Sequence, residues 1–350
     1  MRRELGLPVD ELLVLWVGRL SAAGKADLVP GMTVVAELMH RTPQPIRLVI
    51  AGADDEGYVA TLRTHAAALG IAERVWLQVP LPPAQRHLWH AAADVFISPA
   101  DSMQETFGLT CIEAMACGVP QVVADWDGYR DTVVEGVTGH LAPTTWIDAD
   151  RDVGTMAAVG VWSFDHFALA QAVVVDMEVF GQQLARLLVH EDLRRRMGEA
   201  SRARALERYS WPAVVARYDA LWSELGTTAK AAPAPKRGNG SYIESRYVAT
   251  FRGNATHMID TSARLVLSER GQRVVAGEEG FPQYFVDHGF TLDYDLIEDA
   301  LVLLSHRGKS IAQIVARVMR GRTIHHDLAV RHVVWLLKYG LARLLPDRRP

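Results

Sequence analysis

Two glutamates, Glu105 and Glu113, lie eight residues apart where a strand, a loop and a helix are predicted to follow one another. The segment 94–99 is typical of a short buried strand, and 107–117 of a helix that begins near Gly108. The first backbone N–H groups of such a helix lack intrahelical partners, so with the helix dipole they form a site for a diphosphate. One carboxylate could then hold sugar hydroxyls while the other holds a ribose diol.

The simpler interpretation treats both glutamates as ordinary helix residues. Glu105 would be a charge that the helix dipole favours, and Glu113 would be a solvated side chain. Because two glutamates at this spacing often occur by chance, the pair alone does not establish a binding site. The neighbouring motifs decide between the two interpretations.

A second motif lies upstream, where Gly18 and Arg19 end a predicted strand and Lys25 follows in the next loop. Arginine offers a fork that matches phosphate oxygens and lysine offers a point charge, so both could stabilise negative charge on a leaving diphosphate. The alternative is a pair of solvated loop cations.

Together these motifs resemble the retaining, GT-B-fold glycosyltransferases of family 4, also described as glycosyl transferases group 1. The segment 105–120 is similar to the E-x7-E signature of that family, and 17–25 is similar to its phosphate-binding element. The segments 122–131 and 135–139 resemble the strand, loop and turn that come next in the family. The resemblance covers roughly residues 10–225 and keeps the family's order of motifs.

The resemblance implies a role for each matching residue. Arg19 and Lys25 would clamp the donor diphosphate beside Gly18, and Glu113 would bind the ribose hydroxyls. Glu105 would hold the transferred sugar together with the backbone of its neighbours Phe107, Gly108 and Leu109. The catalytic group would thus be Glu105, Arg19 and Lys25.

The same scheme implies no cofactor and no metal, because the two cations and the helix amides would supply the positive charge. The segment 325–327, His-His-Asp, does contain metal-ligand residue types. Adjacent histidines point apart on most backbones, so we do not expect a metal site there.

Composition indicates a soluble enzyme that we expect in the cytoplasm. The chain of 350 residues is 49% hydrophobic and 22% charged, and its net charge of −4 disfavours a general polyanion binder. Cys111 and Cys117 are the two cysteines, and we expect buried thiols rather than a disulfide framework. The first residues do not form a signal peptide, and no stretch of about 20 uncharged apolar residues predicts a membrane span.

The predicted fold class is α/β: a Rossmann-like, doubly wound parallel sheet, the C-terminal half of a GT-B fold, followed by a small, mainly helical, winged-helix-like domain. Strands are expected at 12–17, 46–51, 75–79, 94–98 and 121–124, and helices near 29–41, 57–69, 83–92 and 107–117. Three further helices are expected at 179–189, 193–209 and 212–225, packed on the sheet or against a neighbour.

Three segments follow from this pattern. Residues 1–225 would form the nucleotide-sugar-binding domain with its trailing helices, 226–240 a small, Pro-rich linker, and 241–350 an accessory domain. In the accessory domain we expect a hairpin over 264–275 that turns at Glu269-Arg270-Gly271. The expected helices there are 295–305, 310–319 and 329–339, with His332 solvated on the last.

The resemblance begins at the second of the two Rossmann-like domains of a GT-B enzyme. Either a separate polypeptide supplies the acceptor-binding N-terminal domain in trans, or the chain is a fragment. The expected function is the donor-binding half of a retaining hexosyltransferase that uses a nucleotide-diphosphate sugar and an unknown sugar, lipid or protein acceptor. The alternative is a noncatalytic nucleotide-sugar-binding module. The accessory domain carries only a mild excess of basic residues, so we expect no nucleic-acid partner.

Overall fold

The computed structural model describes residues 1–103, 105–157, 164–231, 246–284, 292–304 and 308–346. Its central element is a six-stranded parallel sheet with the order β3-β2-β1-β4-β5-β6. The strands are β1 (Leu12–Arg19), β2 (Ile46–Ala53), β3 (Val75–Gln78), β4 (Val95–Ser98), β5 (Gln121–Ala124) and β6 (Gly139–Ala142). The chain reverses its direction of winding between β1 and β4, which is where ligands bind in open sheets of this kind.

Alternate residues of the strands belong to two separate hydrophobic cores, one on each face of the sheet. Leu12, Val14 and Trp16 of β1 lie in the first core, and Leu13 and Leu15 lie in the second. Strands that are buried on both faces need continuous apolar runs, and β1 has one.

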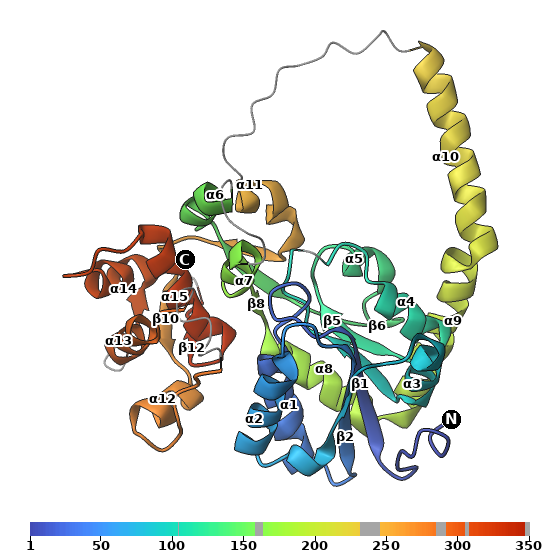
Figure 1. Cartoon of the computed structure of the whole chain (residues 1–350), viewed down its shortest axis with the longest axis horizontal. Helices are drawn as coiled ribbons and strands as arrows, with labels where there is room; N and C mark the ends of the chain where they lie inside the picture. Colours follow the sequence, from blue (N-terminus) through green and yellow to red (C-terminus); the bar gives the residue numbers. More distant parts are fainter. Residues whose placement is uncertain (104, 158–163, 232–245, 285–291, 305–307, 347–350) are drawn as a thin grey trace.

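Helices cover both faces of the sheet (Figure 1). The first face carries α1 (Leu28–Arg41), α2 (Tyr58–Ala68) and α8 (Met177–Val189), and the second carries α3 (Arg86–Ala92) and α4 (Leu109–Ala116). The short helix α5 (Tyr129–Thr132) follows β5, and the 3-10 turns η1 (Ala72–Arg74) and η2 (Pro83–Gln85) precede β3 and α3. The predicted Rossmann-like fold is therefore confirmed.

A second sheet extends this unit in a way that local patterns did not predict. Its order is β8-β7-β9, with β7 (Thr144–Ile147), β8 (Val174–Val175) and β9 (His257–Ile259). β7 pairs in parallel with β9, so a strand from far along the chain joins the first unit. The helices α6 (Arg151–Ala157), α7 (Phe164–Ala170) and α11 (Tyr247–Phe251) and the turn η3 (Arg252–Asn254) belong to the connecting segments.

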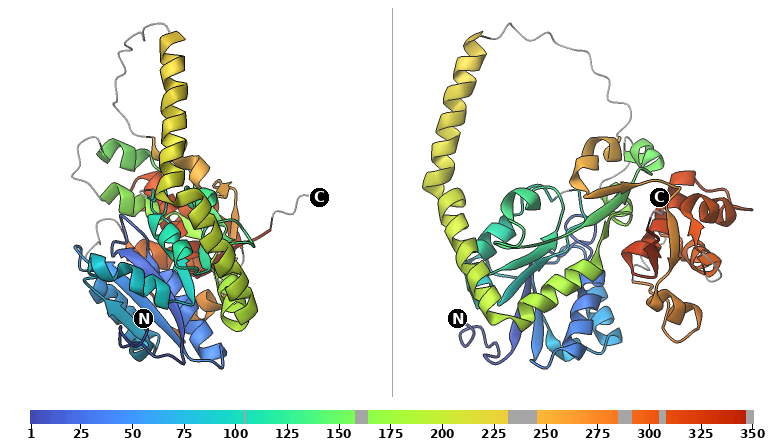
Figure 2. Two further views of the ribbon diagram at one scale, coloured as in Figure 1. Left: turned by 90° about the vertical axis from the view of Figure 1, so that its right-hand side faces the viewer. Right: turned by 180° about the vertical axis from the view of Figure 1, so that it is seen from behind.

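The three predicted trailing helices are present, but they differ in what they pack against. α8 contacts α1 and the sheet, and α9 (Glu191–Tyr209) packs against α4. α10 (Trp211–Ala231) projects away from the body of the molecule in all three views (Figures 1 and 2). It continues through residues 226–231, so the start of the predicted linker is helical, while 232–245 lie outside the described residues.

The described residues of the accessory unit form a three-stranded antiparallel sheet of order β11-β10-β12 and four helices. Its elements are β10 (Arg264–Leu267), α12 (Glu269–Val275), α13 (Tyr294–Leu304), β11 (Lys309–Ser310), α14 (Ile311–Val318), α15 (His326–Lys338) and β12 (Ala342–Leu344). The last three predicted helices are confirmed.

The predicted hairpin over 264–275 is wrong, because β10 leads directly into α12. The Ser268 hydroxyl accepts a hydrogen bond from the Gly271 N–H at 2.9 Å and so caps that helix. The solvated position predicted for His332 is also wrong, since its side chain is buried. Within the part of the chain that the structure describes, none of the helices has the length and apolar character needed to cross a bilayer.

Candidate functional site

The predicted site residues lie on loops at the carboxyl ends of β1 and β4. Gly18 and Arg19 end β1, and Lys25 lies in the loop between β1 and α1. Glu105 lies in the loop between β4 and α4, which begins after Ser98. Parallel strands bring these loops to one edge of the sheet.

Glu105 is the centre of a buried polar cluster. Its carboxylate accepts an ion-pair hydrogen bond from the Lys25 ammonium. The same oxygen accepts the Tyr129 hydroxyl at 2.9 Å, and the Tyr129 oxygen lies 2.7 Å from the Ser98 hydroxyl. Because Tyr129 donates to Glu105, Ser98 is the donor in the second bond. Glu105 is only 5% exposed, so an unpaired carboxylate there would be costly.

Burial raises the pKa of Tyr129 well above its usual value, and the nearby Glu105 charge adds to this effect. The phenol therefore stays protonated and remains a hydrogen-bond donor. Trp126 and Tyr129 are both fully buried. The bond from Tyr129 to Glu105 was missed, and the position of Tyr129 just after β5 was the signal that could have indicated it.

Two glycines permit the close contacts of this cluster. Gly108 precedes α4 with φ of 80°, and a Cβ there would come within 2.4 Å of the Tyr129 ring. Gly128 lies against the Glu105 loop, where a Cβ would be 2.3 Å from the Thr106 carbonyl oxygen. The glycines therefore allow the backbone after β5 to pack directly on the Glu105 loop.

The amino end of α4 faces this cluster without a side-chain cap from any of the described residues. Its first N–H groups are therefore available for an anion in the geometry expected of helix ends. Phe107 and Leu109, whose backbone was assigned to the sugar and phosphate, are 45% and 66% exposed. This end of the helix is open to solvent.

Arg19 is the last residue of β1, and the loop that follows it carries Lys25. Its guanidinium donates to the Gly24 carbonyl at 3.1 Å. A Cβ at Gly18 would be 3.2 Å from the Lys25 side chain, so the absence of a side chain there makes room for the lysine. The structure thus brings Lys25 into direct contact with Glu105, and it places Gly18 and Arg19 beside the loop that carries Lys25.

Glu113 has other partners. It lies in the second turn of α4, 3.2 Å from Arg86 and 3.3 Å from the buried His90, both of α3. Partial burial acts to raise the pKa of Glu113, but hydrogen bonds and charge from His90 and Arg86 outweigh it and hold the pKa below its usual value. Glu113 is therefore an ionised acceptor, and its two α3 partners were missed by sequence reasoning.

Asp127 adds another carboxyl near Glu105. It adopts a left-handed backbone conformation with φ of 41°, which is uncommon outside glycine. Burial raises its pKa and the Glu105 charge raises it further. The two cysteines are free thiols, and burial raises the pKa of both Cys111 and Cys117, so neither is an activated nucleophile.

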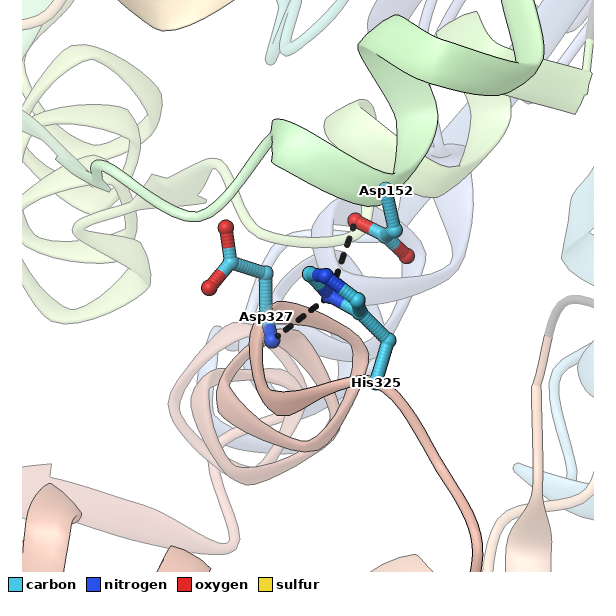
Figure 3. Close-up of side chains that lie close together, drawn as sticks. All are labelled: Asp152, His325 and Asp327. Atoms are coloured by element: carbon cyan, nitrogen blue, oxygen red, sulfur yellow. Dashed lines mark hydrogen bonds and ion pairs between the residues drawn. The ribbon is translucent and has the colours of Figure 1, made fainter.

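A group of metal-ligand residue types lies elsewhere, between α6 and α15. Asp152, His325 and Asp327 lie close together (Figure 3), and their potential ligand atoms are within 4.8 Å of one another. Both Asp152 oxygens accept from Arg331, at 2.6 and 2.7 Å, and Asp327 accepts the Arg151 N–H at 3.1 Å. The Arg331 guanidinium already pairs with the Asp152 carboxylate. These residues therefore form ion pairs that join α6 to α15.

Comparison with known proteins identifies a family match for the first part of the chain. Residues 1–153 match the family model described as "Glycosyl transferases group 1". The chain is 31% identical over 199 residues to a D-inositol 3-phosphate glycosyltransferase of Xylanimonas cellulosilytica, covering 53% of this chain and 46% of that protein. It is also 31% identical over 248 residues to that of Corynebacterium efficiens, covering 69% and 49%. The chain thus spans about half the length of these curated relatives.

Solved structures give weaker matches. Sucrose-phosphate synthase from Thermosynechococcus elongatus is 23% identical, with a TM-score of 0.48 over 65% of this chain and 48% of that one. Anabaena HepE in complex with UDP and glucose is 19% identical, with a TM-score of 0.45 over 65% and 51%. The family model and the curated relatives support a group 1 glycosyltransferase.

Proposed function

We propose, from the premise that residues 1–153 form a group 1 glycosyltransferase domain, that this chain is the donor-binding half of a retaining hexosyltransferase. The donor would be a nucleotide-diphosphate sugar. The observation that carries the proposal is the convergence of Lys25, Glu105 and Tyr129 beside the uncapped amino end of α4. A cation, a carboxylate and free helix amides are the groups that a sugar diphosphate needs.

Each group has a role in this proposal. Arg19, Lys25 and the α4 amides hold the diphosphate, and Glu113 accepts hydrogen bonds from the ribose hydroxyls. Glu105 accepts hydrogen bonds from the transferred sugar next to the backbone of 107–109. In the ligand-free protein Lys25 is neutralised by Glu105, so donor binding would share the ammonium between the carboxylate and the phosphate.

The proposed transfer takes place on one face of the sugar. The bond from the anomeric carbon to the diphosphate oxygen breaks, and the acceptor hydroxyl forms the new bond on the same side. The acceptor proton passes to the leaving phosphate oxygen. Arg19, Lys25 and the helix amides stabilise the charge that grows on the leaving group, so the scheme needs no metal or cofactor.

Transfer also needs an acceptor site, which we propose is supplied by an N-terminal-type domain, in trans or in a longer chain. The acceptor would be a sugar, a lipid or a protein. We propose that α10 provides the surface for such a domain, because Trp211, Tyr218, Trp222 and Leu225 are exposed at helical spacing on one of its faces. An exposed apolar stripe of this kind marks an interaction site.

A noncatalytic sensor of nucleotide sugars is the second candidate. It is favoured by the direct contacts between the accessory unit and the loops of the site, described below. Sugar transfer by the purified chain to a supplied acceptor would exclude this candidate.

Calorimetric titration with UDP, GDP and ADP and their hexose conjugates tests the donor site. We expect selective binding of one nucleotide that weakens at least tenfold in Arg19→Ala and Glu113→Ala. In Glu105→Ala we expect loss of the preference for the hexose conjugate. Glu199→Ala, on the exposed surface of α9, is the matched control and should bind as the parent does. Equal affinity of all variants would exclude the proposed site.

A further inference from the structure

The accessory unit reaches the proposed donor site through two consecutive residues at the end of α15. The Lys338 ammonium donates to Asp101 at 2.5 Å and to the Ala170 carbonyl at 2.8 Å. The Tyr339 hydroxyl donates to Asp27 at 2.5 Å, and Lys338 lies 3.7 Å from that same carboxylate. We call these four side chains the Lys338 network: Lys338, Tyr339, Asp27 and Asp101.

The Lys338 network is fully enclosed. Lys338 is 3% exposed at its side chain, and Asp27 and Asp101 are 0% and 4% exposed. Burial raises the pKa of Asp101, and the Lys338 charge opposes that rise. Burial also raises the pKa of Tyr339, so the phenol stays a donor. Two carboxylates therefore depend on one ammonium for charge compensation, and its loss would leave buried negative charge unpaired.

Hydrogen bonds link Asp27 to Asp101 and to the surrounding backbone. The Asp27 N–H donates to Asp101 at 3.2 Å, and the Asp27 carboxylate caps α1 by accepting the Val29 N–H at 3.1 Å. Tyr58 of α2 also donates to Asp27, at 3.1 Å. These buried hydrogen bonds thus join the loop after β1 to the loop after β4.

Short stretches of backbone connect this network to the proposed site. Asp27 follows Lys25 by two residues, and Asp101 precedes Glu105 by four. Between them, the Ser102 carbonyl accepts the Glu105 N–H at 3.1 Å, and the Ser102 hydroxyl donates to the Ala23 carbonyl at 3.1 Å. A shift of either carboxylate would therefore move Lys25 or Glu105.

We propose that Lys338 is a positioning residue for nucleotide-diphosphate binding: through Asp101 and Asp27 it holds the loops that carry Glu105 and Lys25 in the geometry that accepts a diphosphate. The inference rests on the proposed function and extends it, because it makes docking of the accessory unit a condition for a competent donor site. Lys338 itself touches neither Lys25 nor Glu105 among the contacts that the structure gives. It acts through the loop backbone.

A matched pair of interface variants tests this role. Lys338→Met removes the ammonium with little change of volume. Arg331→Met removes a second buried cation of the same interface, which binds Asp152 and the Ala149 carbonyl; no contact given among the described residues joins it to either loop. Both variants weaken docking, but only the first should alter the donor site. The parent, both variants and the double variant Lys338→Met with Asp101→Asn are compared.

The measurements are calorimetric affinity for the nucleotide sugar that the parent binds, and hydrogen–deuterium exchange of peptides spanning 19–30 and 99–108 in the ligand-free protein. We expect Lys338→Met to weaken binding at least tenfold and to speed exchange in both peptides. Arg331→Met should stay within twofold in affinity and leave both peptides unchanged. Asp101→Asn should restore part of the affinity of Lys338→Met, because it removes the carboxylate that lost its partner.

Equal losses in Lys338→Met and Arg331→Met, or unchanged exchange in both peptides, would overturn the positioning role. If Lys338→Met does not fold, Tyr339→Phe replaces it, since this change removes only the hydroxyl and keeps the ring stacked on Trp335 at 4.0 Å. A smaller loss of affinity with faster exchange in peptide 19–30 is then expected, and no change in either would count against the proposal. A parent protein that binds no nucleotide sugar would reject the proposed function itself, a result that is distinct from these.

Discussion

Among the described residues the Glu105 carboxylate has two donors, Lys25 and Tyr129, and of these two only Lys25 can turn toward a ligand. Tyr129 is buried on the inner side of the cluster and keeps its proton, whereas Lys25 extends from a loop. In the proposed donor complex, a phosphate at the amino end of α4 would therefore compete with Glu105 for the Lys25 ammonium and not for the Tyr129 phenol. Glu105 would then set how much of the Lys25 charge is available to the phosphate.

This competition gives a prediction for Glu105→Gln. The amide keeps the size of the side chain but removes the charge that neutralises Lys25, so affinity for a nucleoside diphosphate without sugar should stay equal or rise. Affinity for the sugar conjugate should fall, because an amide is a weaker acceptor than a carboxylate. The ratio of the two affinities, measured by calorimetry, should drop by about tenfold, the equivalent of 1.4 kcal/mol. A parallel fall of both affinities would contradict the competition.

Two strands of the central sheet approach each other at paired glycines. Gly18 of β1 lies opposite Gly52 of β2, and a Cβ on Gly52 would be 1.6 Å from the Gly18 carbonyl oxygen. Because this contact lies just before Arg19, the close packing of β1 on β2 fixes where the arginine leaves the sheet.

Gly52→Ala should therefore destabilise the protein, by about 1–3 kcal/mol or more, since overpacking at a backbone contact forces the strands apart. Gly226→Ala is the opposite case. Its Cβ would meet nothing within 4 Å, and alanine is favoured over glycine inside a helix such as α10 by about 1 kcal/mol. Urea unfolding should show a loss for the first variant and no loss for the second. Equal midpoints would mean that the sheet relaxes around the added methyl.

Sequence patterns predicted the elements whose signals are local. The apolar run of β1 and the strand–loop–helix around Glu105 were read correctly because each depends on neighbouring residues. The element α12 was misread because Gly271 suggested a turn. In the structure Gly271 is required by a close approach instead, since a Cβ there would lie 2.0 Å from the Leu341 carbonyl oxygen.

Partners from distant segments could not be predicted in this way. His332 looked solvated because it interrupts an apolar stripe, yet it accepts the Asp293 N–H at 2.8 Å and approaches the Leu328 carbonyl at 2.7 Å. The Lys338 network depends on how the accessory unit docks, and no short motif encodes that. The roles of Arg19, Lys25, Glu105 and Glu113 remain predictions.

At the scale of the whole molecule, buried neutral histidines make stability depend on pH. Burial lowers the pKa of His332 to about 4, and it lowers that of His65, next to Tyr284 of the accessory unit, to about 4 as well. In the unfolded chain both titrate near 6.5. The unfolded state therefore binds more protons between these values, so stability is complete above about pH 6.5 and is lost as pH falls toward 4.

Between pH 7 and pH 5 each histidine should cost about 2 kcal/mol of folding free energy. Urea unfolding at the two pH values measures the sum. His332→Gln, which can still accept the Asp293 N–H, should lose stability at pH 7 but show a smaller difference between pH 7 and pH 5. The same pH difference in parent and variant would show that His332 is already solvated when folded.

The parallel ladder between β7 and β9 joins residues on either side of 232–245. It is reinforced where Arg130 donates to the Gly253 and Asn254 carbonyls, and where Thr144 and Thr256 exchange hydrogen bonds. Covalent continuity between 231 and 246 is therefore not what keeps the later part of the chain in place. Two separately made pieces, 1–231 and 246–350, therefore carry complementary surfaces, and we expect them to associate when they are mixed.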